Sequence, residues 1–161
     1  MCILTALPSY AQNAVHYYFK TMDIRNGLSQ NTVYQILQDR KGFMWFGTKD
    51  GLNRYDGLSY RVYKKENSGL GKNFITALYE DHEGNIWIGT DGGVFIYNPV
   101  LDSFTAFNQT SDKGTVIKDF VTMIGSDEYD NIWISVENQG LFCYNHEKRL
   151  RNYLHDSGMS N

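Results

Sequence analysis

Three tryptophan-containing segments of similar sequence recur along the 161-residue chain. Each begins with an acidic residue, passes through a short polar turn and continues into an apolar run that carries the tryptophan. The three tryptophans, Trp45, Trp87 and Trp133, lie 42 and 46 residues apart. A repeat of forty-odd residues that contains several short strand patterns is typical of a β-propeller blade. The sequence therefore predicts an all-β chain of three four-stranded antiparallel blades.

Each repeat contains four strand patterns separated by turn residues. The first pattern is apolar and alternating, the second carries the tryptophan, the third ends on a tyrosine, and the fourth is aromatic. These patterns place the blades at residues 28–63, 70–107 and 116–153. A single four-stranded sheet cannot bury both of its faces, so neighbouring blades must stack on each other. We expect the tryptophans to fill the space between blades, and Trp87, in the middle blade, to be the least replaceable.

Two turns of each blade require residues that tolerate a positive φ. An Asp-x-x-Gly turn, capped by its own aspartate, joins the first two strands, and tight turns join the second and third. In the third repeat either Asp130 or Asn131 must take the place of the first glycine, since both residue types tolerate that conformation. The structural glycines predicted from this pattern are Gly42, Gly84, Gly51, Gly93 and Gly140.

Both ends of the chain look like parts of a larger ring. Residues 17–22 have the pattern of a fourth strand without its first three, as expected for an outer strand that closes a propeller ring. Residues 154–161 resemble the start of a further blade, so 12–161 reads as an open arc of a longer propeller. Residues 1–11 have the apolar run and small-x-small ending of a secretory signal that lacks its basic start. A disordered leader is the alternative for that segment.

Composition and residue spacing exclude several classes of function. A net charge of −3 without a basic stripe argues against nucleic acid as a partner. The four histidines have no metal-ligand spacing, and the single cysteine that remains after a cleaved signal, Cys143, can form no internal disulfide. No cofactor, metal or catalytic residue is therefore predicted. The recurring Asp39, Asp81 and Asp127 are assigned to turn capping, because residues that recur once per blade do not converge as a catalytic pair.

The run Asn26-Gly-Leu-Ser-Gln-Asn-Thr-Val33, followed by Gln38-Asp39 and by Gly42-Phe-Met-Trp-Phe-Gly-Thr-Lys-Asp-Gly-Leu-Asn-Arg-Tyr-Asp-Gly57, resembles the two-component regulator propeller repeat. The pattern recurs three times over residues 17–161. The third repeat departs from it, with Asp130 at the turn glycine and Ser135-Val136 in place of Gly-Thr. These departures affect only the turns of that repeat.

The resemblance implies two seven-bladed propellers in the periplasmic sensor of a hybrid two-component regulator, anchored in the inner membrane and homodimeric at full length. Such sensors commonly bind glycan fragments and pass the signal to a histidine kinase. This chain contains no phospho-acceptor histidine motif, ATP lid or receiver aspartate cluster, so we expect it to be a non-enzymatic fragment. The alternatives are an exported interaction scaffold, or a propeller lyase, whose His/Glu metal site these repeats lack.

Propeller ligands commonly bind where the connections between blades and the turns between second and third strands meet. Amide and charged side chains in those segments suit sugar hydroxyls or uronate carboxylates, although exposed loops are polar in any case. The oligosaccharide-binding candidates on this basis are Arg25, Asn31, Lys49, Asp50, Lys72, Asn73, Asp91 and Asn138.

Overall fold

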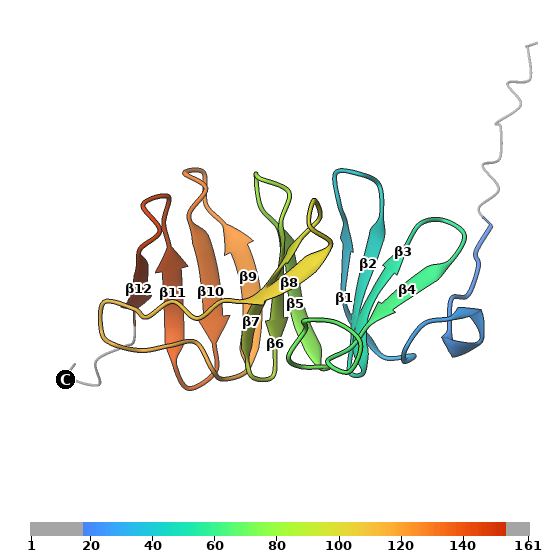
Figure 1. Cartoon of the computed structure of the whole chain (residues 1–161), viewed down its shortest axis with the longest axis horizontal. Coiled ribbons are helices and arrows are strands. Elements are labelled where there is room, and N and C mark those ends of the chain that lie inside the picture. The colour runs from blue at the N-terminus through green and yellow to red at the C-terminus, as the bar shows by residue number, and fades with distance from the viewer. Residues whose placement is uncertain (1–17, 154–161) are drawn as a thin grey trace, which may run out of the picture.

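The computed structural model describes residues 18–153, in which all strands belong to three four-stranded antiparallel sheets (Figure 1). Within each sheet the strands pair in chain order, which confirms the predicted propeller blades. Blade 1 contains β1 (Val33–Gln38), β2 (Met44–Thr48), β3 (Gly51–Tyr55) and β4 (Tyr60–Tyr63). Blade 2 contains β5 (Ile75–Glu80), β6 (Ile86–Thr90), β7 (Gly93–Asn98) and β8 (Ser103–Ala106). Blade 3 contains β9 (Val121–Ser126), β10 (Ile132–Val136), β11 (Gly140–Tyr144) and β12 (Leu150–Tyr153).

Three of the predicted segments lie at the ends of the chain. Residues 18–22 form no strand, and a short 3₁₀ helix, η1 (Ile24–Asn26), follows them. A ring-closing strand needs a partner blade, and none of the three blades pairs with this segment, so the ring-closing role stays a prediction. The predicted signal at 1–11 and the further blade at 154–161 lie outside the described residues. Within residues 18–153 no helix is long and apolar enough to cross a membrane.

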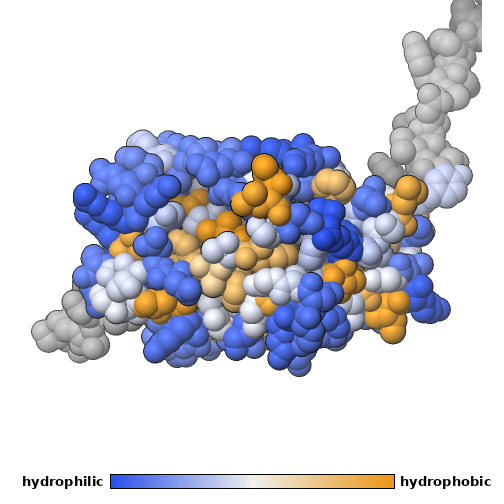
Figure 2. All heavy atoms as spheres, viewed as in Figure 1, coloured by the Kyte–Doolittle hydropathy of each residue, from blue (hydrophilic) through white to orange (hydrophobic). Residues whose placement is uncertain are grey.

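The blades stand side by side, and their first strands β1, β5 and β9 are neighbours (Figure 1). The β1–β2, β5–β6 and β9–β10 hairpin turns lie at one end of the blades, uppermost in Figure 1, which we call the hairpin end. The turns after β2, β6 and β10 and the β4–β5 connection lie at the opposite end, the connection end. Hydrophilic residues gather along both ends, and apolar residues cross the middle (Figure 2).

A carboxylate organises each hairpin turn, as predicted. Asp39 Oδ1 accepts hydrogen bonds from the backbone N–H groups of Lys41 and Phe43, at 2.9 and 3.0 Å. Asp81 and Asp127 accept backbone N–H groups in the same way in the other two blades. The left-handed position of these turns is held by Gly42, Gly84 and Asp130, with φ of 88°, 85° and 60°. Asp130 rather than Asn131 therefore replaces the glycine in the third repeat.

The other Oδ of each aspartate binds the tryptophan of its blade, a contact that the repeat pattern alone did not predict. The indole N–H groups of Trp45, Trp87 and Trp133 donate to Asp39, Asp81 and Asp127 at 2.7, 2.8 and 2.9 Å. A buried indole N–H requires an acceptor. One carboxylate thus both closes the hairpin turn and accepts the hydrogen bond of the indole N–H that packs between the blades.

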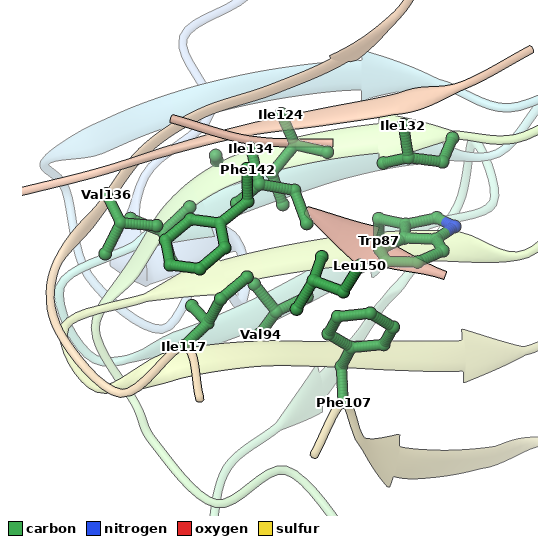
Figure 3. Packing of buried hydrophobic residues seen from close by; sticks show 12 residues of the cluster. Trp87, Val94, Phe107, Ile117, Ile124, Ile132, Ile134, Val136, Phe142 and Leu150 are labelled. Carbon is green, nitrogen blue, oxygen red and sulfur yellow. The ribbon is translucent and has the colours of Figure 1, made fainter. Parts of the chain in front are cut away.

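Two apolar clusters, one at each junction between blades, form the core. Trp45 packs against Tyr63 of its own blade and Tyr97 of blade 2, at ring-centroid distances of 6.0 and 5.1 Å. Trp87 packs in the same way on Phe107, at 5.1 Å (Figure 3). It also packs on Tyr144 of blade 3, at 5.8 Å. The predicted filling of the interblade space by tryptophan is confirmed at both junctions.

The connection before each blade supplies an apolar side chain to the face of that blade. Leu70 and Ile117 belong to the two junction clusters, and Leu28, at the same position in the first repeat, is 5% exposed. Beside Leu28, the Ser29 N–H donates to Asn53 Oδ1 at 2.8 Å, and the Ser29 hydroxyl lies 2.9 Å from that of Thr48. Residues 28–29 therefore cover part of the outward face of blade 1.

Large apolar side chains on both outward faces are exposed. Ile36 of β1 is 59% exposed, and Met123 of β9 is 67% exposed. Trp133 is only half-buried, with Tyr153 as its aromatic neighbour among the described residues. A third junction cluster is thus absent from residues 18–153, and the side chains that would form one line the outside.

Trp87 and Trp133 offer a direct comparison of the interblade contribution to stability. We expect Trp87→Ala to lower the free energy of unfolding by about 3–5 kcal/mol, the usual range for a buried tryptophan. Trp133→Ala should cost clearly less, because within residues 18–153 no second blade packs on that ring. Urea unfolding monitored by circular dichroism measures both values, and equal losses would contradict the interblade role.

Asp127 gives the hairpin turn a measurable pH dependence. The Asn131 amide and the Trp133 indole, both of which donate to it, lower the pKa of Asp127 from 3.8 to about 2. Because the pKa is lower in the folded chain, the carboxylate stabilises the fold above about pH 4, and this contribution is lost as the pH falls through about 2. We expect Asp127→Asn to flatten the stability profile in this window. Urea unfolding at successive pH values tests this, with Glu128→Gln in the same turn retaining the slope.

Candidate functional site

The connection end holds a hollow of about 390 Å³ at the junction of blades 1 and 2. It lies between the turn after β2, the β4–β5 connection and the turn after β6. Seven residues from these segments line it, namely Lys49, Lys65, Gly71, Lys72, Asn73, Phe74 and Asp91. Four of them, Lys49, Lys72, Asn73 and Asp91, are candidates that the sequence placed at this end.

Positive charge dominates the hollow. Three ammonium groups line it, from Lys49, Lys65 and Lys72, against the single carboxylate of Asp91. Lys65 Nζ lies 3.8 Å from Glu66 Oε1, a pair in which both side chains are 58% exposed. Such exposed pairs contribute little and leave the ammonium group available. Within residues 18–153, the Lys49 and Lys72 ammonium groups take part in no ion pair, so the hollow suits an anion.

Backbone hydrogen bonds hold the three segments in place. The Gly51 N–H donates to the Asn73 carbonyl at 2.7 Å, which ties the turn of blade 1 to the β4–β5 connection. The Asp91 N–H donates to the Phe74 carbonyl at 3.3 Å and ties the same connection to the turn of blade 2. Asn73 Oδ1 accepts from the Lys65 N–H at 2.8 Å. The Asn73 amide thus shapes the loop.

Gly92 leaves room for the Lys72 side chain. A Cβ built on Gly92 would lie 2.4 Å from Lys72 Cε and 2.9 Å from its Nζ. The Lys72 side chain therefore lies against the backbone of the blade 2 turn at Gly92.

A row of three aromatic rings extends from the hollow across the blades, at the start of the first strand of each blade. Phe74 lies 4.8 Å from Tyr34 and 5.6 Å from Phe120, measured between ring centroids. Tyr34 is 47% exposed, and Phe74 and Phe120 are half-buried. Binding sites for organic ligands combine such rings with a few polar groups that fix orientation.

The remaining candidates lie outside the hollow. Asp50 borders it and pairs with Lys64, whose Nζ is 2.5 Å from Asp50 Oδ2. Arg25 pairs with Asp23 beside η1, and Asn31 Oδ1 accepts the Ile24 N–H at 3.0 Å. Asn138, in blade 3, donates to Asp119 at 3.3 Å. Their polar groups therefore stabilise local loops. Exposed loop residues are often polar for this reason, without binding a ligand.

Sequence analysis missed Lys65 and Phe74. Phe74 directly precedes β5, and aromatic residues at Phe74 and Phe120 in equivalent repeat positions were the signal available for it. Lys65 lies in the long β4–β5 connection, whose path the sequence does not determine.

The remaining sequence features lie apart from the hollow. Among residues 18–153, no group of three or more His, Cys, Asp and Glu side chains is placed to hold a metal ion. Cys143 is buried in β11, and this burial raises the pKa of its thiol. The recurring aspartates lie in separate hairpin turns, at the end opposite the hollow.

Comparison with known families decides what these repeats are. Residues 27–50 and 69–92 match the family model of the two component regulator propeller. These segments are two component regulator propeller repeats. Each matched segment runs from the connection before a blade into the turn after its second strand. The first contains Lys49 of the hollow, and the second contains Lys72 and Asp91.

Two similar solved structures are extracellular domains of hybrid two component systems. Over 83% of its length, this chain is similar to the extracellular domain of a protein described as the hybrid two component system BT3049 of B. thetaiotaomicron, with a TM-score of 0.73 and 29% identity. It covers 20% of that domain. A second extracellular domain, of system BT4673 from the same organism, aligns over 72% of this chain with a TM-score of 0.63 and 30% identity, and 17% of it is covered.

A curated relative points in the same direction. A stretch of 59 residues is 42% identical to histidine kinase P4 of Formosa agariphila and amounts to 37% of this chain. It amounts to 4% of that kinase. The chain therefore spans a small part of the proteins it matches, and these matches concern the propeller.

Proposed function

We propose that the chain is part of the periplasmic sensor region of a hybrid two-component regulator, and that it binds an oligosaccharide carrying carboxylate or sulfate groups. The propeller repeats and the likeness to extracellular domains of hybrid two component systems support the sensor role. One observation carries the ligand class, namely the three lysines that face a single carboxylate in the hollow.

The hollow has the chemistry that an acidic sugar requires. Lys49 and Lys72 supply point charges and hydrogen-bond donors for an acidic group, while Asp91 accepts from hydroxyl groups. The exposed edge of the Tyr34–Phe74–Phe120 row offers apolar ring faces next to these groups. A ligand of a few sugar units would contact both the lysines and the rings.

The position of the hollow also suits signal transmission. Its lining comes from two neighbouring blades, so a bound anion that bridges Lys49 and Lys72 favours one relative placement of the blades over others. The kinase that reads this change belongs to another part of the protein. We place homodimer formation and membrane anchoring in the full-length sensor as well.

Isothermal titration with charged and neutral oligosaccharides tests the proposal. We expect oligouronates or sulfated oligosaccharides to bind and neutral oligosaccharides of equal length to bind at least several-fold more weakly. Lys49→Gln and Lys72→Gln should each raise the Kd for the acidic ligand by about two- to fivefold, as expected for partly exposed charge pairs. Binding should also weaken as the salt concentration rises.

The control removes the same charge elsewhere. Lys113, in the β8–β9 connection, is exposed and lies outside the hollow, so Lys113→Gln should leave the affinity unchanged. Equal affinity for acidic and neutral ligands would contradict the ligand class. A folded chain that binds no oligosaccharide but retains a protein partner would instead favour an interaction scaffold.

A further inference from the structure

The two junctions between blades differ at the hairpin end, although the repeats are equivalent there. The first junction leaves a hollow of about 110 Å³ beside Arg40, and the second leaves one of about 290 Å³ beside His82. The two hollows have linings from equivalent positions of the repeat. The residues of the first hollow and their counterparts in the second are Asp39 and Asp81, Lys41 and Glu83, Gly84 and Asp130, and Ile86 and Ile132. The difference in size therefore comes from a few side chains on a shared backbone.

Two guanidinium groups occupy the first junction. Arg40 Nε lies 2.8 Å from Glu80 Oε1, and Arg40 also donates to the carbonyls of Asp81 and His82 at 2.5 and 2.8 Å. The Arg54 guanidinium lies 4.7 Å from the centre of the Phe43 ring, and its Nη1 donates to the Tyr97 hydroxyl at 3.1 Å. A stacked cation with a hydroxyl acceptor is a common environment for arginine.

The second junction lacks both arginines. His82 takes the position of Arg40, and Ile96 takes that of Arg54, because the Trp45–Arg54 and Trp87–Ile96 pairs have the same register. Tyr79 reaches across to Ser126, with an O–O distance of 2.7 Å, and joins the blades where the Arg40–Glu80 pair does so in the first junction. The blades thus remain joined, and the space that corresponds to the one filled by the Arg40 and Arg54 guanidinium groups in the first junction stays open.

The polar groups around this space match a cation. Tyr144 is the equivalent of Tyr97, but its hydroxyl has no hydrogen-bond partner within residues 18–153. Asp81, Glu83 and Asp130 line the hollow together with Lys148, His82 and His146. The Asp81 carboxylate already accepts the Trp87 indole N–H, which leaves Glu83 and Asp130 as the carboxylates for a bound cation. Burial, together with the charge of Glu83, raises the pKa of Tyr144, so its hydroxyl stays protonated.

We propose that the hollow between blades 2 and 3 binds a guanidinium group supplied by a ligand or by an arginine of a partner. The bound group would donate to the Tyr144 hydroxyl and to the Glu83 and Asp130 carboxylates, beside the Trp87 and Ile96 side chains. It would occupy the place that Arg54 holds in the first junction. This site lies at the hairpin end, opposite the lysine-lined hollow, and does not depend on that hollow.

Titration with Nα-acetyl-arginine amide, followed by NMR, tests this proposal on the whole chain. We expect a saturable shift of the Trp87 indole N–H signal with a Kd on the order of 1 mM. The matched citrulline compound, which has the same shape without the charge, should produce no saturable shift. Methylguanidinium and an arginine-containing peptide distinguish the two sources, since a partner segment requires the peptide to bind more tightly.

Variants locate the site. Asp130→Asn keeps a residue that tolerates the left-handed turn, and Tyr144→Phe removes only the hydroxyl. The double variant should weaken binding at least about fivefold, as expected for the loss of one charged and one neutral hydrogen bond. Glu128→Gln removes one charge from the same turn outside the hollow and should leave the Kd unchanged.

Ile96→Arg provides the strongest test, because it restores the arginine of the first junction. The introduced guanidinium should occupy the hollow, bond to Tyr144 and abolish the response of Trp87 to Nα-acetyl-arginine amide, while circular dichroism shows an intact fold. Equal binding of the citrulline compound, or an unchanged Kd in both the double variant and Ile96→Arg, would overturn the proposal.

Discussion

The hydrogen bond from each tryptophan indole to the aspartate six residues earlier is the constraint on which this arrangement depends. It is present in all three blades, at 2.7, 2.8 and 2.9 Å. An indole N–H that lost its acceptor in the interblade core would carry the desolvation cost of an unsatisfied polar group. The aspartate removes this cost without a second polar group in the core, because its other oxygen already closes the hairpin turn. Turn formation and blade stacking therefore rely on one side chain.

Sequence periodicity predicts the blades well because each strand pattern is local. The four-strand order, the turn positions and the interblade tryptophans all depend on residues that lie within one repeat. The role of Asp39 in capping its turn was predictable for the same reason. Its second bond, to Trp45, was not, because the pattern does not show which way a turn side chain directs its other oxygen. The sequence also left Asp130 and Asn131 equivalent as turn residues, and only the backbone angles separate them.

The candidate site was only half predictable. Four of the eight sequence candidates line one hollow, because they belong to segments that the repeat places at one end of the blades. The other four serve their own loops or border the hollow, and a polar loop residue gives no sign of which it will do. Lys65 enters the hollow only through the path of the β4–β5 connection. That path depends on contacts such as the Gly51–Asn73 hydrogen bond, which join segments far apart in the repeat.

Equivalent positions in neighbouring repeats show how such a fold acquires distinct sites at little cost. Blade stacking relies on the tryptophans and their aromatic neighbours, so rim positions such as Arg54 and Ile96 can differ while the junction stays closed. The polar Ser29–Asn53 contact on blade 1 follows the same logic. Gly71 and Phe95 are the equivalents of Ser29 and Asn53 in the next repeat, and there the glycine lies against the phenylalanine ring. A small residue facing a large one thus replaces the pair of polar groups of the first repeat. In a repeat protein each junction is stabilised mainly by its own two neighbours. A side-chain substitution at one junction therefore changes the stability of the other junctions little, and each junction can present a different surface to a ligand.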